Sequence, residues 1–348
     1  MMNPAYDQIL AADDETRAGL FTTTAQRLGT TPQNAEKDFW VCWVLDALFN
    51  GRVDGPRLLF KGGTSLSKGF GLISRFSEDI DVTVFRDDLG QAYSVDELAK
   101  LSGKKREAAL DAIKTACAAY ITGPLLAELS DIAARASDRN GLPAGALKIL
   151  PHPKDDQTLL VHYPTATPSD GYVDQQVKIE SGAKSALDPH STRIVRPYVE
   201  ADAPGLDLSV ANVTVVDAER TFWDKVVILH GQSQWFINRG DLQGGGNRVS
   251  RHYYDVHLLM TSEEGKRAMA DPALGADCVA HARMFFDRKP YNLAIAQPPT
   301  FTLVPEGDMY DVLRRDYVAM SAMIFGPPPR FDAVIESVTA LEAIVNRV

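Results

Sequence analysis

Two groups of residues within FKGGTSLSKGFGLISRFSEDIDVTVF, residues 60–85, have side chains suited to phosphate and metal chemistry. Glycines at the end of a strand let backbone amides approach a ligand closely, because no Cβ intervenes. If a helix follows from Ser65, its N-terminal amides favour an anion such as phosphate. Lys61 and Lys68 add positive charge, and residues 57–77 contain four basic residues and no acidic one, although the net charge of the chain is −10. The pattern therefore indicates an anion site at this turn.

The second group is a pair of carboxylates. Asp79 and Asp81 lie two residues apart in the expected strand DIDVTVF, so both point to the same face. Two adjacent carboxylates repel unless a cation or a proton lies between them. Mg²⁺ fits, because it prefers one or two carboxylates and completes its shell with water and substrate phosphates. Ile80, Val82 and Val84 are expected to face a core on the other side.

Each signal is weak alone. A D-x-D pair is often a solvated strand face, and the glycine turn is not a P-loop, since no G-x-x-x-x-G-K-[ST] motif is present. A strand, a glycine–hydroxyl turn, a helix and a D-x-D strand in succession are much more specific. Together they favour a nucleotide and metal site.

The elements around this site change in type along the chain. The residues up to about 50 have helical apolar spacing, as in TPQNAEKDFWVCWVLDALF. Seven short apolar or alternating segments are typical of strands: RLLFKGG, DIDVTVF, LKILPHP, TLLVHYP, YVDQQVKIES, TRIVRPYVE and LSVANVTVVD. After Asp217, an expected N-cap, the pattern is mostly helical. We predict an N-terminal helical segment (1–50), an α/β core (51–215) with a helical insert (about 94–140), and a helical C-terminal domain (216–348).

The composition limits the class of protein. No apolar segment approaches the roughly 18–20 residues that a membrane span needs, and the N-terminus lacks the pattern of a secretory signal. Cys42, Cys117 and Cys278 share no metal-ligand spacing and suit a reducing cytoplasm. The net charge of −10 argues against a protein that coats nucleic acid by bulk electrostatics, but it is compatible with a local basic cleft.

The sequences KGGTSL, SKGF and RFSEDID resemble motif I of the polymerase-β-like nucleotidyltransferase superfamily. More narrowly, they resemble the AbiEii/MenT-type toxins of type IV toxin–antitoxin and phage abortive-infection systems. Further blocks similar to this family follow in order: EKDFWV, VKIES, ERTFWDKVVILH, RHYYDVHLL and LRRDYVAMSAMIFGPPPRFDAVI. The resemblance implies an α+β fold, with a mixed sheet flanked by helices and a mostly helical C-terminal domain.

The resemblance also implies an activity. A nucleoside monophosphate would pass from an NTP to an acceptor hydroxyl with release of pyrophosphate, in a reaction that depends on positioning and electrostatics. The implied acceptor is RNA, in particular the 3′ end of a tRNA, and the implied protein partner is a cognate antitoxin. Asp79 and Asp81 would hold Mg²⁺, as one ion or two. Two alternatives are transfer to a protein hydroxyl (NMPylation) and an inactive toxin-like protein that binds a partner.

Further residues acquire roles through the resemblance. The phosphates of the NTP would lie against Lys61, Gly62, Gly63, Thr64, Ser65, Ser77 and Arg251. Lys61 could instead face the edge of the core. Glu180 in VKIES is the candidate for a third metal-binding carboxylate, and its alternative is a surface ion-pair ladder with Lys178.

The C-terminal half contributes one further group. Lys225 lies in an apolar helical pattern, where burial is costly without an anionic partner, so we expect it at the triphosphate. Its alternative is a surface lysine whose ammonium reaches water. Arg251 and Asp255 share a helix face, either as an exposed pair or, as the resemblance implies, with Arg251 at a phosphate and Asp255 orienting Lys225 or the metal shell. Tyr253 and Tyr254 are expected in the core.

Overall fold

The computed structural model describes residues 1–168, 175–246 and 248–347, which form two compact units. Unit 1 consists of Met1–Gly69, Phe76–Tyr93 and Gly103–Val215, and unit 2 consists of Phe70–Arg75, Ser94–Ser102 and Val216–Val348. The chain thus passes from one unit to the other several times. Among the helices of the described ranges, none has the length and apolarity required to cross a membrane.

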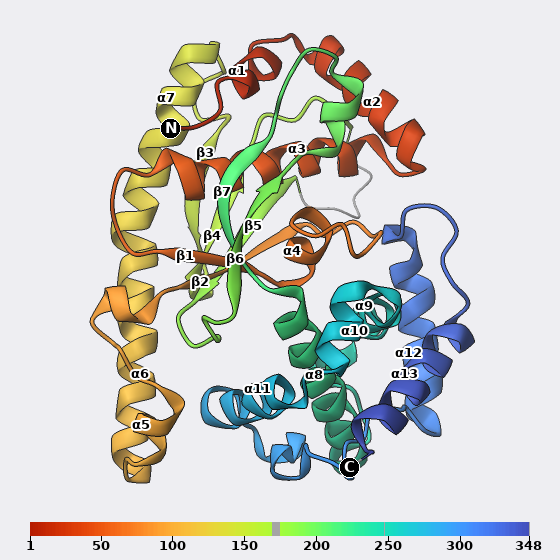
Figure 1. The fold of residues 1–348 in the computed structure, drawn as a ribbon. Helices are drawn as coiled ribbons and strands as arrows, with labels where there is room; N and C mark the ends of the chain where they lie inside the picture. The colour runs from red at the N-terminus through yellow and green to blue at the C-terminus, as the bar shows by residue number, and fades with distance from the viewer. Residues whose placement is uncertain (169–174, 247, 348) are drawn as a thin grey trace. The chain divides into compact units, whose positions relative to one another are not determined.

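A seven-stranded mixed sheet forms the centre of unit 1, in the order β3-β4-β5-β2-β1-β7-β6 (Figure 1). Strand β1 is antiparallel to β2 and parallel to β7, β2 is parallel to β5, and β4 is antiparallel to both β3 and β5. The strands are β1 (Leu58–Lys61), β2 (Asp79–Val84), β3 (Lys148–His152), β4 (Asp155–His162), β5 (Gln176–Gly182), β6 (His190–Val195) and β7 (Val210–Val216). The predicted α+β class is confirmed.

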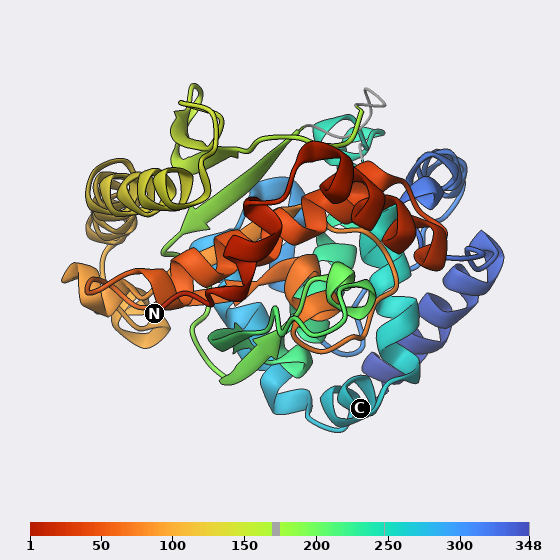
Figure 2. The same ribbon diagram turned by 90° about the horizontal axis from the view of Figure 1, so that it is seen from above.

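Helices flank this sheet. Helix α3 packs on β2 and β5 (Figure 2), whereas α6 contacts β4 and β5 and α7 contacts β3. The α-helices of unit 1 are α1 (Ala5–Leu10), α2 (Asp14–Leu28), α3 (Pro32–Asp46), α4 (Gly62–Lys68), α6 (Gly103–Tyr120) and α7 (Leu126–Asn140). Thr31 caps α3, since its side chain accepts from the amide of Asn34, and Pro32 occupies the first turn. The segment predicted as a helical insert is helical, and its first helix, α5 (Val95–Ala99), belongs to unit 2.

Helix α3 contains three consecutive buried charged residues, Glu36, Lys37 and Asp38. Glu36 accepts hydrogen bonds from the backbone amides of residues 166 and 167, at 2.7 and 3.0 Å. The Lys37 ammonium donates to Glu78 Oε2 over 2.8 Å, directly before β2 begins. Because burying an unpaired charge is costly, these partners fix how α3 lies against the sheet.

Asp38 holds the C-terminal end of α4, the helix that begins at the glycine turn. Its carboxylate forms an ion pair with Lys68, the last residue of α4, and both side chains are 3% exposed. The Lys68 ammonium also lies 3.3 Å from the centre of the Tyr198 ring and donates to the carbonyl of Arg196 over 3.2 Å. Asp38 Oδ2 in turn accepts from the Tyr198 amide over 2.7 Å.

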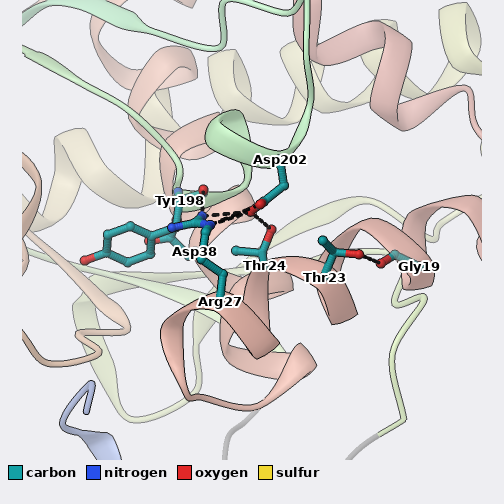
Figure 3. A network of polar contacts seen from close by, with 7 residues as sticks. All are labelled: Gly19, Thr23, Thr24, Arg27, Asp38, Tyr198 and Asp202. Atoms are coloured by element: carbon teal, nitrogen blue, oxygen red, sulfur yellow. Dashed lines mark hydrogen bonds and ion pairs between the residues drawn. The ribbon is translucent and has the colours of Figure 1, made fainter.

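Tyr198 begins the 3₁₀-helix η4 (Tyr198–Asp202), which α2 holds from the other side (Figure 3). Arg27 donates to the carbonyl of Tyr198 over 2.7 Å and to both carboxylate oxygens of Asp202. Thr24 donates to Asp202 as well, over 2.8 Å. Helices α2 and α3 therefore both hold η4. Through η4 they also hold the Tyr198 ring, which lies over the Lys68 ammonium.

Unit 2 is mostly helical. Helix α8 contacts α9, α10 and α11, and α9 also contacts α12 and α13. The α-helices after Val216 are α8 (Ala218–Arg239), α9 (Ser250–Thr261), α10 (Glu263–Met269), α11 (Pro272–Phe285), α12 (Asp308–Met320) and α13 (Phe331–Val345). Asp217 occupies the N-cap position of α8, as predicted. Residues 70–75 belong here because Arg75 forms a β-bridge with Ile324 and the carbonyl of Ser74 accepts from the Phe325 amide over 2.9 Å.

The substitution Lys68→Met tests the anchoring of α4. It leaves the Asp38 carboxylate buried without its cation, so we expect the free energy of unfolding to fall by about 3–5 kcal/mol in urea denaturation. Lys266→Met is the control, because Lys266 and Glu263 form an ion pair with side chains that are 57% and 73% exposed. The control should change stability by less than about 1 kcal/mol. An equally small loss in Lys68→Met would contradict the anchoring role.

Candidate functional site: a carboxylate face on the central sheet

The predicted carboxylates lie on one face of the sheet in unit 1. In the strand registers, Asp79 pairs with Lys178 of β5, and Asp81 pairs with Glu180 of β5 and with Lys61 of β1. Residues paired across neighbouring strands point to the same face. Asp79, Asp81 and Glu180 therefore share a face with two lysines, and all five side chains are partly accessible. This set of residues is termed the carboxylate face.

The opposite side of β2 is core. Ile80, Val82 and Val84 are fully buried, as the alternating pattern predicts. Val177 and Ile179 of β5 are fully buried as well. Burial of the apolar side holds both strands in register, so the charged side chains project from a rigid support.

The electrostatics of the carboxylate face favour a bound cation. Burial, together with the negative charges of Glu78 and Glu180, raises the pKa of Asp79 to about 6, although Lys37 and Lys178 oppose the shift. Ionisation of Asp79 is therefore costly in the protein alone. A divalent cation next to the carboxylate would favour the ionised form.

Asp79 and Asp81 are the residues suited to hold such a cation. Mg²⁺ requires only one or two protein carboxylates, because water and phosphate oxygens complete its shell. Across residues 1–168, 175–246 and 248–347, no group of three or more His, Cys, Asp or Glu side chains has an arrangement able to hold a metal ion. The geometry therefore fits a metal held by two carboxylates and by its substrate.

The glycine turn packs directly against the second carboxylate. Gly62 has a φ of +82°, and a Cβ on this residue would lie 2.2 Å from Oδ2 of Asp81. Only glycine fits, because any side chain would collide with the carboxylate and strain the backbone. Helix α4 begins at Gly62, three residues before the expected start at Ser65. The turn thus positions Asp81, whatever ligand its amides contact.

The hydroxyls of the turn are engaged within the protein. Thr64 is buried, and its Oγ1 donates to the carbonyl of Asp79 over 2.5 Å and lies 2.7 Å from Oγ of Ser77. Ser65 is buried as well and donates to the carbonyl of Gly62 over 2.9 Å. These bonds join the turn to the start of β2, and phosphate contacts of Gly62, Gly63, Thr64, Ser65 and Ser77 remain predictions.

The two lysines near the turn have different environments. Lys61 points to the carboxylate face, where its Nζ lies 3.7 Å from Oδ1 of Asp81 and its side chain is 30% exposed. Lys68 does not supply free charge, because Asp38, Tyr198 and the carbonyl of Arg196 surround its buried ammonium. The number of basic residues in 57–77 therefore overestimates the positive charge that a bound anion could contact.

The residues predicted in the C-terminal half form a buried cluster within unit 2. The Lys225 ammonium of α8 donates to Oδ2 of Asp255 of α9 over 2.7 Å. Arg75 donates to both oxygens of the same carboxylate, over 2.8 and 2.9 Å. Asp255 is 0% exposed and Lys225 is 4% exposed. Neither the surface-lysine alternative for Lys225 nor the exposed-pair alternative for Asp255 is therefore correct.

Two cations bind the carboxylate of Asp255 in this cluster. Burial opposes ionisation of Asp255, but Arg75 and Lys225 outweigh it and hold the pKa of Asp255 well below its usual range. Burial lowers the pKa of Lys225. Asp255 opposes this shift, and the positive charges of Arg75 and Arg251 add to it. Arg75 and Lys225 thus share one carboxylate, and Arg251 adds positive charge near Lys225. An additional anion near Lys225 would favour its charged form.

Comparison with known proteins decides the family. The family model described as the nucleotidyl transferase AbiEii toxin of a type IV toxin–antitoxin system matches residues 43–337, which is most of the chain. The chain belongs to the AbiEii family. It is accordingly a nucleotidyltransferase toxin of this class, as the motif resemblance implied.

Two further comparisons add little to this AbiEii assignment. The solved structure of MenT4, a nucleotidyltransferase toxin from Mycobacterium tuberculosis H37Rv, matches with a TM-score of 0.40 and 15% sequence identity. That match covers 95% of this chain and 99% of the MenT4 chain, but a likeness at this level identifies neither fold nor activity. The search of curated proteins gives no match.

Sequence reasoning missed the partners of several predicted residues. Arg75 counted only as one of several basic residues, whereas it binds Asp255. The block EKDFWV was recognised as a family feature without a role for its charges, which pair Lys37 with Glu78 and Asp38 with Lys68. The signal in the sequence that could have indicated these ion pairs is the run of three successive charged residues in an otherwise apolar helix. Tyr253 and Tyr254 are buried, as predicted.

The substitution Gly62→Ala tests the contact between the turn and Asp81. Gly90→Ala is the matched control, because Gly90 has a φ of +70° and a Cβ there would meet no atom within 4 Å. Both variants carry the backbone strain of about 1–2 kcal/mol, and Gly62→Ala should lose a further 1–3 kcal/mol or so from the collision. Urea denaturation measures the difference. Equal losses in the two variants would show that the turn does not constrain Asp81.

Two further variants test the cluster in unit 2. Asp255→Asn removes the carboxylate that both Arg75 and Lys225 bind, so the free energy of unfolding should fall by about 3–5 kcal/mol. Lys225→Met keeps the two-bond contact between Arg75 and Asp255 and should cost clearly less. Urea denaturation of both variants gives the order. A larger loss for Lys225→Met than for Asp255→Asn would show that Lys225, and not Arg75, is the main partner of the carboxylate.

Proposed function

We propose that this AbiEii-family protein transfers a nucleoside monophosphate from an NTP to an RNA, in particular to the 3′ end of a tRNA, with Mg²⁺ as cofactor. The observation that carries the proposal is the packing of the Gly62 turn against Asp81, with Asp79 on the same face. A turn suited to phosphate and two carboxylates suited to a metal are thereby joined in one rigid arrangement. Family membership supplies the reaction class.

The reaction forms a phosphoester bond and breaks a phosphoanhydride bond. The oxygen of the acceptor hydroxyl bonds to the α-phosphorus as the bond from that phosphorus to the bridging oxygen of the β-phosphate breaks. Pyrophosphate leaves with this bonding electron pair, and the hydroxyl proton passes to solvent or to a neighbouring base. Negative charge develops on the phosphate and leaving-group oxygens, so positioned cations and amide donors supply most of the catalysis.

In unit 1, Asp79 and Asp81 are proposed to hold the metal, and Glu180, which the resemblance implied as a third ligand, is proposed to lie beside them on the same face. Mg²⁺, as one ion or two, supplies charge neutralisation at the phosphate oxygens when bound. Lys61 is proposed to add positive charge near Asp81, 3.7 Å away. The nucleotide is proposed to contact the turn and strand start through Gly62, Gly63, Thr64, Ser65 and Ser77. Amides of the turn are the available donors, since the Thr64 and Ser65 hydroxyls already donate within the protein.

In unit 2, we assign Lys225 and Arg251 to the triphosphate and Asp255 to the positioning of Lys225. The assignment is supported by the positive charges of Arg75 and Arg251 near Lys225, since a bound anion would favour its charged ammonium. Lys225 is bound to Asp255 over 2.7 Å, so its ammonium is already oriented. Preorganised charge of this kind costs no rearrangement during the reaction.

Charge and family membership support the proposed type of acceptor. A net charge of −10 suits a protein that reads one end of an RNA rather than a long backbone. The toxin family also suggests a cytoplasmic site of action and neutralisation by a cognate antitoxin.

The decisive experiment incubates the protein with Mg²⁺, each α-³²P-labelled NTP in turn, and total RNA or total cell protein. Asp79→Ala/Asp81→Ala should reduce labelling of RNA by at least about 100-fold, because each residue contributes to charge stabilisation. Asp87→Ala, an exposed carboxylate just after β2, is the matched control and should label normally.

The outcome separates three functions. Label in RNA that the double variant loses supports the proposal and identifies the preferred nucleotide. Label in protein instead would favour NMPylation. Absence of label in both pools, with no NTP binding, would show that the protein acts by binding a partner.

A further inference from the structure

One feature of the carboxylate face is unexplained by the proposed function: a lysine lies within the group of acids. Lys178 is paired in register with Asp79, and it lies two residues before Glu180 on the same strand and face. Its ammonium donates to Oε1 of Glu180, and the two side chains are 36% and 41% exposed. A cation at this position reduces the charge that would otherwise attract a metal.

The other lysine of the face makes a different contact. Lys61 lies 3.7 Å from Asp81, which is beyond hydrogen-bond distance for this pair, and its side chain is 30% exposed. Lys61 and Lys178 therefore have similar exposure and the same orientation on the sheet. Of these two lysines, only Lys178 donates a hydrogen bond to a carboxylate oxygen of the face.

The pairing has a consequence for metal ligation. A carboxylate that accepts from an ammonium has to give up that bond before it can enter a metal shell. The described ranges accordingly contain no cluster of three acidic, histidine or cysteine side chains arranged for a metal, even though Asp79, Asp81 and Glu180 share a face. Glu180 contributes negative charge near Asp79 but is held by Lys178.

We propose that Lys178 is a positioning residue that withholds Glu180 from the metal shell, so that the carboxylate face binds a divalent cation tightly only together with an NTP. A site with two carboxylates leaves most of the coordination shell of the cation to water and to phosphate oxygens. Release of Glu180 would instead complete a three-carboxylate site that binds metal without nucleotide. The inference rests on the proposed function, since it assumes that Asp79 and Asp81 are the metal ligands.

The test is binding of Mn²⁺ to the whole protein without nucleotide, measured by electron paramagnetic resonance of the free ion. Lys178→Met should tighten Mn²⁺ binding at least tenfold, and the double variant Lys178→Met/Glu180→Gln should return to the wild-type affinity. Lys178→Arg should keep the wild-type affinity, because the guanidinium also holds a carboxylate. Glu180→Gln alone should weaken binding by less than tenfold, because it removes a nearby negative charge but no metal ligand.

Lys61→Met is the matched control for general electrostatics. Any tightening of Mn²⁺ binding that it causes should persist when Glu180→Gln is added, whereas the effect of Lys178→Met should disappear. A Lys178→Met variant with wild-type affinity would overturn the inference. So would a tenfold loss of affinity in Glu180→Gln alone, because Glu180 would then already be a ligand.

Failure of the proposed function is distinguishable in the same assay. Asp79→Asn/Asp81→Asn should abolish Mn²⁺ binding in both the wild-type and the Lys178→Met background. Persistence of binding in this double variant would overturn the two-carboxylate site itself, and with it the inference.

Discussion

Three consecutive charges at the start of α3 cannot reach water, and the arrangement of unit 1 depends on how they are satisfied. Glu36 binds a loop, Lys37 binds Glu78, and Asp38 binds Lys68. A buried charge that loses its partner costs several kcal/mol, so each contact has little freedom. Lys68 ends α4 and Glu78 precedes β2. One helix therefore holds the end of α4, which begins at the glycine turn, and the residue before β2, which carries the carboxylates.

This support explains how a small, charged group of residues can remain in a fixed geometry. Burial, and after it the negative charges of Glu78 and Glu180, raise the pKa of Asp79 to about 6, so its ionised form is unfavourable in this setting. The apolar side of β2, the ion pair of Glu78 and the close packing of Gly62 nevertheless hold the strand in place. The free energy of folding thus maintains a site whose charges would separate if they were mobile. Such preorganisation is what nucleotidyl transfer requires of a protein.

The sequence predicted what depends on local spacing. The alternation along β2 predicted that Asp79 and Asp81 share one face and that Ile80 lies on the opposite face. The strands and the C-terminal helices were predicted from the spacing of their apolar residues. The ion pairs could not be predicted from local spacing, because Lys37 and Glu78 are 41 residues apart in the sequence and Arg75 and Asp255 are 180 residues apart. Nothing in the spacing of a lysine indicates whether its partner is water, a phosphate or a distant aspartate. For Lys68 the count of nearby charges indicated a free cation, and the fold buries it.

Residues 70–75 have a consequence for how this protein can be divided. They lie in the chain between α4 and β2 of unit 1, yet they belong to unit 2, to which they bring Arg75. A fragment that begins near residue 216 would contain Asp255 and Lys225 but would lack the arginine that binds both oxygens of the carboxylate. Neither unit is a continuous piece of sequence, so no cut at a single position in the chain yields either unit complete.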